Sequence, residues 1–467
     1  MSVHDGFFEL GGHSLLGTQL IARLRKVLEV DLALSDLFEA PTVAGLAARL
    51  ESGHAADGTR ATAIGILDRD GSELPLSFAE ERLWFLDQMG AGAGYNMPMA
   101  IRARGALDIA ALEQSIATIA QRHETLRTSF PVVEGRPRIS IADRFDVPLE
   151  VIDRTGLSDA ERDAEINRLA TTEAHVPFDL DRGPLLRAKL IQLAEDDHVL
   201  VVTFHHIVSD GWSAGVFARE LMAFYDGFVQ GHEPRVATLP VQYVDYAAWQ
   251  RSWLRGDELD RQFAYWEEEL RDLPVLSLPT DRPRPTVASF AGDSSRFELS
   301  PEIVTAVHDL GRREGVTPAM LLLGAFQVLL ARYSGQDDVA VGSPIANRVH
   351  PDVENLIGFF VNTLVLRTNL SGDPTFVEVL RRVRKASLGA YDHQDLHFER
   401  LVDKLEPERD MSRNPLFQVA FMLQNMPRVE IELPGMAIEQ APLDFSTVRV
   451  DLELYLHETD GRISGRA

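Results

Sequence analysis

The run DHVLVVTFHHI, residues 197–207, constrains the fold more than any other segment. Its apolar residues are consecutive and the run is too short to span a membrane, so it predicts a buried strand. Helical patterns stand on both sides, at residues 108–122 and 212–228. The segment therefore belongs to a domain of mixed α and β structure.

The rest of the chain predicts several further units, since 467 residues are too many for one core. The first fifty read as a small helical domain, with a long amphipathic helix from Ser14 and two short helices N-capped by Ser35 and Thr42. An aperiodic, Gly- and Ala-rich linker follows. Beyond it, helix, strand and motif-bearing loop occur twice in outline. We expect domains at 1–52, 76–250 and 251–467, with a linker at 53–75.

Composition excludes several classes of function. Lys and Arg number 46 against 71 Asp and Glu, and the net charge of −25 argues against nucleic-acid binding. The N-terminus has no signal-peptide pattern and no apolar stretch reaches membrane-span length, so we expect a cytoplasmic protein without a membrane partner. Cysteine is absent, which removes disulfides and thiolate nucleophiles.

The stretch DGFFELGGHSLL, residues 5–16, places Ser14 directly after two glycines and at the start of the amphipathic helix. Two readings are open on spacing alone. The serine is an ordinary N-cap, or its hydroxyl carries a phosphate that the helix N-terminus stabilises.

The second stretch of interest, HHIVSDGWS, has three readings: a metal site, packed histidines, or acid–base chemistry. Side chains alternate along a strand, so His205 and His206 should face opposite sides, which counts against chelation. No metal site is predicted. The pattern of two histidines, an acid and a Gly-Trp turn is more particular than packing requires.

The first stretch resembles the signature of peptidyl carrier proteins of nonribosomal peptide synthetases. The resemblance implies that Ser14 carries a covalent 4′-phosphopantetheine, with Gly11, Gly12 and His13 beside it, and that the absent cysteine is replaced by the thiol of this group. It also implies a phosphopantetheinyl transferase as a partner. The family's first helix lies about thirty residues ahead of this motif, so we expect an N-terminally truncated carrier.

From Leu76 onward the chain resembles condensation domains, relatives of chloramphenicol acetyltransferase. Besides the HHxxxDG motif, matching segments occur in the family's order: LSFAEERLWFLDQ, RHETLRTSF, YVDYAAWQ, IGFFVNTLVLR, HQDLHFERLV and RNPLFQVAF. The implied fold is α+β, a helical-bundle carrier followed by two acetyltransferase-like lobes in a V-shaped pseudo-dimer. The implied reaction is amide formation, in which the amine of a downstream aminoacyl thioester attacks an upstream peptidyl thioester.

The resemblance also assigns roles. His206 positions the amine or takes its proton, His205 supports it, and Gly211 lets the substrate arms approach. Asp210 could orient His206 as a triad acid, but the family favours a structural salt bridge with Arg82. Trp212 and Ser213 belong to the motif, and the alternative for Trp212 is that it is only a packing residue. Asn362 is expected to shape the tunnel from the second lobe, again with packing as the alternative.

The motifs look most like the subtype that joins an L-donor to an L-acceptor, with the DL subtype open. A condensation-like domain that only recruits other enzymes is a further alternative, although such domains usually have degraded motifs. Implied partners are an upstream adenylation domain, a downstream adenylation domain and an acceptor carrier. His397 stands where proline is usual, and the sequence gives no explanation for this difference. The last residues resemble a hairpin that lies ahead of the family's C-terminus, so we expect C-terminal truncation.

Overall fold

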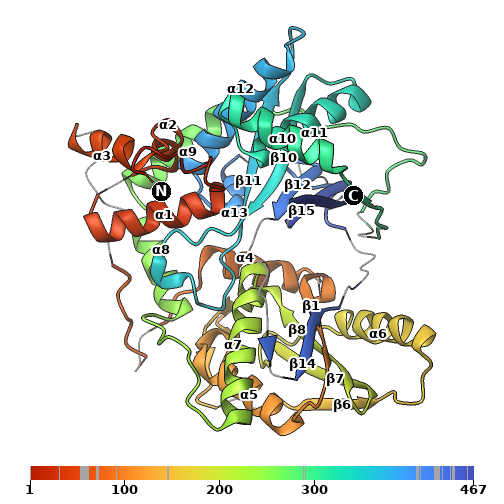
Figure 1. Cartoon of the computed structure of the whole chain (residues 1–467). Coiled ribbons are helices and arrows are strands. Elements are labelled where there is room, and N and C mark those ends of the chain that lie inside the picture. Colours follow the sequence, from red (N-terminus) through yellow and green to blue (C-terminus); the bar gives the residue numbers. More distant parts are fainter. Residues whose placement is uncertain are drawn as a thin grey trace.

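The computed structural model describes residues 2–30, 32–52, 63–69, 73–90, 92–144, 147–287, 289, 291–405, 410, 412–424, 432–433, 435–441, 443, 448–459 and 461–467. Two lobes are stacked along the long direction of Figure 1, and a group of N-terminal helices lies beside the upper lobe. Within the described residues each lobe is built on a six-stranded sheet covered by helices. The expected α+β class is confirmed.

The N-terminal domain contains α1 (Ser14–Leu28), α2 (Leu34–Glu39) and α3 (Val43–Glu51). Thr42 caps α3 by accepting the backbone N–H of Gly45, as expected. The expectation for Ser35 was wrong, because α2 begins one residue earlier, at Leu34. Ala33 is the cap residue, and its N–H is bonded by the carboxylate of Asp36.

The lower lobe in Figure 1, which we call the N-lobe, follows the N-terminal domain along the chain. Its sheet has the order β13-β14-β1-β8-β7-β6. The expected buried strand is β8, whose nine positions are all buried, and it lies inside the sheet between β1 and β7. The bounds are α4 (Phe78–Gln88), η1 (Gly92–Tyr95), β1 (Asn96–Arg104), α5 (Ile109–Arg122), η2 (Glu124–Arg127), β2 (Thr128–Ser129), β3 (Val132–Val133), β4 (Arg136–Pro137), β5 (Ser140–Ile141), β6 (Leu149–Asp153), α6 (Asp159–Ala174), β7 (Leu186–Ala194), β8 (Asp197–His205), η3 (His206–Val208), α7 (Gly211–Gln230) and α8 (Tyr243–Trp253).

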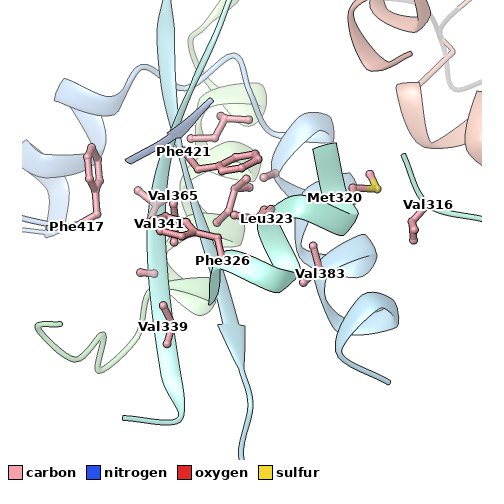
Figure 2. Packing of buried hydrophobic residues seen from close by; sticks show 14 of the residues in the cluster. Val316, Met320, Leu323, Phe326, Val339, Val341, Val365, Val383, Phe417 and Phe421 are labelled. Carbon is pink, nitrogen blue, oxygen red and sulfur yellow. The ribbon is translucent and has the colours of Figure 1, made fainter. Parts of the chain in front are cut away.

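The upper lobe, the C-lobe, has the sheet order β11-β10-β12-β15-β16-β9. Figure 2 shows its core, where Leu323 and Phe326 of helix α11 face Val341 on β10 and Val365 on the edge strand β11. The bounds are α9 (Asp257–Glu269), β9 (Arg296–Glu298), α10 (Pro301–Glu314), α11 (Pro318–Ser334), β10 (Asp338–Ile345), η4 (Pro351–Val353), β11 (Asn362–Asn369), α12 (Phe376–Asp392), α13 (Phe398–Leu405), β12 (Val419–Gln424), β13 (Glu432–Leu433), β14 (Met436–Gln440), β15 (Leu452–Thr459) and β16 (Arg462–Arg466).

The boundary expected at residue 250 needs one correction. Strands β13 and β14 lie late in the chain, yet they belong to the N-lobe sheet, where β14 pairs antiparallel with β1. The edge of β1 offers unpaired backbone groups, and a strand from the other lobe satisfies them. The two lobes are therefore joined by an exchanged hairpin as well as by the chain between α8 and α9.

The expected linker at 53–75 is also shorter than predicted. Residues 53–62 and 70–72 lie outside the described part of the chain. Ile64 is buried against tyrosines of α8, and the N–H of Leu67 donates to Asp245. Arg69 forms ion pairs with Asp245 and Glu124 at 2.7 and 2.9 Å. This part of the linker is bound to the N-lobe surface.

No single helix among the described residues is long and apolar enough to cross a membrane, and α10 with α11 passes such a test only as a pair bent by 104°.

Candidate active site

The double-histidine motif lies where three elements meet. His205 is the last residue of β8, His206 is the first residue of the one-turn helix η3, and Asp210 is the N-cap of α7. The carboxylate of Asp210 accepts the backbone N–H of Ser213, as N-cap aspartates do. The sheet and the long helix α7 thus fix both ends of the motif loop.

His206 has one ring nitrogen committed and one available for chemistry. Its Nδ1 lies 2.8 Å from the carbonyl oxygen of Ser209. Because a carbonyl only accepts, Nδ1 carries the hydrogen and Nε2 keeps its lone pair. Burial, with a smaller contribution from the positive charge of Arg449, lowers the pKa of His206 to about 4. The imidazole is therefore neutral at pH 7 and can accept a proton or a hydrogen bond through Nε2.

His205 faces a different environment, as the sequence predicted. Its Nδ1 accepts the backbone N–H of Ile207, and its ring meets the edge of Phe178 in the N-lobe, whereas His206 meets Phe359 in the C-lobe. The reason differs in part from strand alternation, because the strand ends at His205. Burial lowers the pKa of His205 to about 3, so it supports the loop as a neutral group.

Asp210 forms a structural ion pair, but with a partner other than the expected one. Its carboxylate lies 3.2 Å from the guanidinium of Arg348 in the C-lobe and also accepts the N–H of Phe360. Arg82, the predicted partner, lies on α4 instead, where its charge acts on Tyr95 and Glu399. The prediction of Arg82 was wrong. The triad reading also fails, since the Nδ1 of His206 is bonded to a carbonyl.

Trp212 and Ser213 bind the motif to the same C-lobe segment. The indole N–H of Trp212 donates to the carbonyl of Glu354 at 2.8 Å, and the hydroxyl of Ser213 donates to the carbonyl of Gly358 at 2.8 Å. Arg348 in turn donates to the Ser213 hydroxyl. The motif helix is thereby held across the boundary between the lobes.

Asn362 is a packing residue in this structure. Its amide N–H₂ donates to the carbonyls of Gln394 and Leu396, and its oxygen accepts the N–H groups of Thr363 and Phe398. The side chain is 3% exposed and is not among the residues that line the cavity described next. Its contribution to the tunnel is indirect, through the position of Gln394.

A cavity of about 220 Å³ runs from the motif into the C-lobe. Asp210, Gly211 and Trp212 line it on one side, and most of the remaining lining comes from α11, α12, β10 and β12. A Cβ built on Gly211 would meet no atom within 4 Å, and the φ of this residue is outside the left-handed region. Gly211 therefore keeps space open and is not required by the backbone conformation.

Ser14 lines the same cavity from the N-terminal domain. It is the first residue of α1, but the N-cap is His13, whose ring accepts the N–H of Leu16. Ser14 lines the cavity together with Tyr391 of α12, and its side chain partly offsets the rise in the pKa of that tyrosine that burial causes. The N-cap reading of Ser14 was wrong, and its hydroxyl faces the C-lobe.

Two ion pairs and an apolar contact hold the N-terminal domain in this position. Arg23 lies 3.0 Å from Glu354, and Lys26 lies 2.6 Å from Asp352. The buried side chains of α2 belong to one cluster with the core of the C-lobe. Glu354 thus contacts the N-terminal domain through its side chain and Trp212 through its carbonyl.

Sequence reasoning missed several residues of this site, namely Arg348, Arg449, Tyr391 and Asn347. None stands in a motif with a distinctive spacing. They come together with Ser14 and the His206 loop only because the C-lobe packs against the N-lobe and the N-terminal domain.

Comparisons with known proteins identify the same two units. The family described as "Condensation domain" matches residues 71–466, and "Phosphopantetheine attachment site" matches residues 1–50. One of the linear gramicidin synthase proteins of Brevibacillus parabrevis is 49% identical over 464 residues, and malpinin synthetase of Mortierella alpina is 45% identical over 467. These matches cover 98% and 100% of the chain, which spans only 9% and 6% of the two relatives.

Solved structures agree on the fold. The X-domain from teicoplanin biosynthesis superposes with a TM-score of 0.78 and 30% identity, over 87% of this chain and 91% of that one. The first condensation domain of the calcium-dependent antibiotic synthetase gives a TM-score of 0.71 at 22% identity, over 85% and 91%. The expected two-lobed condensation fold is confirmed.

The residues around Ser14 fit a phosphopantetheine group. The hydroxyl stands at the N-terminus of a 15-residue helix, which favours a phosphate, and it borders a cavity long enough to reach Gly211. A Cβ on Gly12 would lie 2.5 Å from the ring of Phe7, so glycine is needed for the chain to fold closely before Ser14.

Proposed function

The chain belongs to the condensation-domain family of nonribosomal peptide synthetases, with a phosphopantetheine attachment domain ahead of it, and on that premise we propose that it forms amide bonds between carrier-bound acyl groups. One observation carries the proposal. Ser14 and Gly211 line one cavity, so the attachment serine and the loop that bears His206 border the same space.

The prosthetic group on Ser14 would supply a thiol that holds the acyl chain as a thioester. The chain's own residues do the rest. The Nε2 lone pair of His206 accepts a hydrogen bond from the attacking amine, which orients the nitrogen, and it can receive the proton that the amine loses as the C–N bond forms. The C–S bond of the thioester breaks in the same reaction, and the sulfur leaves as a thiolate that takes up one proton. The lowered pKa keeps this lone pair available at neutral pH.

Asp210 and Arg348 have a positioning role in this proposal. Their ion pair, together with the bonds of Ser213, fixes the loop between His206 and α7. Neither group is hydrogen-bonded to the imidazole in the described part of the chain, so they act chiefly on the geometry of the loop, while the charge of Asp210 partly offsets the lowering of the His206 pKa by burial. Trp212 adds a link to the segment that receives the N-terminal domain.

We further propose that the attached carrier is the donor, because it is docked with Ser14 at the cavity. The partners that follow are a phosphopantetheinyl transferase, adenylation domains upstream and downstream, and an acceptor carrier. The motifs favour the subtype that joins an L-donor to an L-acceptor. A cytoplasmic location is part of the same proposal.

A recruiting platform is the alternative function, and one comparison favours it. The X-domain from teicoplanin biosynthesis has also been solved in a complex with OxyB, and it is 30% identical to this chain. The complete motif argues against this alternative, and so does the Nε2 of His206, which makes no hydrogen bond with the residues that the structure describes. Amide formation by the purified chain, lost in His206→Ala, would exclude a purely recruiting role.

The attachment half of the proposal is tested by intact mass after incubation with coenzyme A and a phosphopantetheinyl transferase. We expect the wild type to gain one phosphopantetheine and Ser14→Ala to gain none. Ser35→Ala, in the same domain and away from the cavity, is the matched control and should gain one. A gain by Ser14→Ala would refute the assignment.

A further inference from the structure

One residue that lines the cavity has a side-chain oxygen without a hydrogen-bond partner in the described part of the chain. Asn347 lines the cavity and is only 5% exposed. Its side-chain oxygen meets no donor among the residues that the structure describes. Buried carbonyl oxygens are almost always hydrogen-bonded, so a buried oxygen without a described donor, on a residue that lines a cavity, points to a donor that arrives with a ligand.

The backbone holds this side chain in place. Asn347 has a φ of 49°, in the left-handed region that asparagine tolerates better than most residues. The next residue, Arg348, is anchored through the carbonyls of Val353 and Leu356 and through Asp210. An unusual conformation next to a rigid anchor is typical of functional sites. The oxygen is thus presented at a fixed point.

The remainder of the cavity suits a chain that is mostly hydrocarbon with a few polar groups. Met320, Leu323 and Phe421 line it, and Ser14 lies at its border. A phosphopantetheine arm has two secondary amides along an otherwise aliphatic chain, and each amide offers one N–H. Asn347 lines the same cavity as the attachment serine and the motif loop, and the next residue, Arg348, contacts Asp210.

We propose that the side-chain carbonyl of Asn347 accepts a hydrogen bond from an amide N–H of the arm and so holds the arm inside the cavity with its thiol end toward Gly211. This inference rests on the proposed attachment of the arm to Ser14. It assigns a positioning residue that contacts the arm and not the reacting atoms.

The absence of cysteine allows a test that does not depend on turnover. In the loaded 467-residue chain the thiol of the arm is the one thiol present, because the sequence has no cysteine. A thiol inside the cavity is protected from iodoacetamide, whereas a thiol outside it is not. The rate of alkylation, followed by intact mass, therefore reports how much of the arm is inserted.

We expect Asn347→Gly to raise the alkylation rate about two- to tenfold, the effect of losing one neutral hydrogen bond. Glycine keeps the left-handed backbone, so the fold should be retained. Asn347→Asp keeps an oxygen in place and should stay near the wild-type rate. Asp373→Gly is the matched control, because Asp373 has a φ of 50° but is exposed and outside the cavity lining.

Gly211→Leu, which fills the cavity, calibrates the rate of an arm that is held outside. Equal alkylation rates for the wild type and Asn347→Gly would overturn the role of Asn347 and leave the proposed function untouched. An equal rise in Asn347→Gly and Asp373→Gly, or in Asn347→Gly and Asn347→Asp, would overturn it too. Failure of Ser14 to load would overturn the proposed function together with it, and the mass spectrum separates these cases.

Discussion

Replacing Arg348 with methionine tests how the two lobes are held at the motif. The guanidinium is 3% exposed, and it faces Asp210, which is 2% exposed, across 3.2 Å. Methionine is of similar length but removes the charge and all its donors. Asp210 would keep the N–H groups of Ser213 and Phe360 but would lose its counter-charge in a buried site.

The size of the effect follows from this burial. Removing one partner of a buried ion pair costs about 3–5 kcal/mol, because the other charge stays buried without compensation. Domains of this size lose about 2–4 °C in Tm per kcal/mol, so Arg348→Met should lower the Tm by about 6–20 °C. Arg82→Met is the matched control, and since Arg82 does not pair with Asp210 it should cost about 1 kcal/mol or less.

Thermal unfolding and hydrogen exchange measure the two variants. We expect Arg348→Met to increase exchange in the segments around Asp210 and Phe360, and Arg82→Met to leave them protected. A Tm that falls as much for Arg82→Met as for Arg348→Met would refute this account of the ion pair. Asp210→Asn with Arg348→Met should recover part of the loss, because the buried charge is then gone.

Three further predictions concern the site and the docked carrier. Because the pKa of His206 is about 4, its titration should cause no break near pH 6.5 in the pH profile of amide formation. The free energy of unfolding should fall as the pH drops from about 6.5 to about 4, because in this range the unfolded chain binds a proton at His206 that the folded chain does not. A break near pH 6.5 that disappears in His206→Gln would contradict this pKa. Gly211→Leu should keep the Tm of the wild type and lower amide formation by about 100-fold, since its side chain enters the cavity, and unchanged turnover would contradict this. Arg23→Glu should slow transfer from the docked carrier by about fivefold or less, because Arg23 is 62% exposed and solvent screens its pair with Glu354. Arg23→Glu with Glu354→Arg should restore the rate, and a double variant slower than the single one would contradict the docking.

The sequence predicted the elements and the chemistry better than the contacts between lobes. The run at 197–207 and the helix that starts at Ser14 are local patterns, and both are present as β8 and α1. The arginine that pairs with Asp210 is determined by how a loop of the C-lobe packs on the N-lobe. The spacing of residues along the chain does not predict this packing. The same holds for β14, whose pattern does not say which sheet it joins.

His397 shows the same limit. Its presence in place of proline had no explanation in the sequence. In the structure its Nε2 lies 2.7 Å from the side-chain nitrogen of Gln250 on α8, whose oxygen accepts the N–H of Phe78 on α4. Burial lowers the pKa of His397 to about 4, so a neutral imidazole joins the lobes at this point. Only the assembled interface gives the residue a role.

The central claim is that His206 promotes amide formation on an acyl group delivered from Ser14. The direct measurement is a single-turnover assay: the chain is loaded at Ser14 with an acyl thioester, an acceptor carrier bearing an amino acid is added, and the acceptor is followed by intact mass. We predict transfer by the wild type and a rate lower by about 10²–10⁴-fold in His206→Ala. Transfer at the same rate by His206→Ala, or no transfer by a fully loaded wild type, would contradict the account.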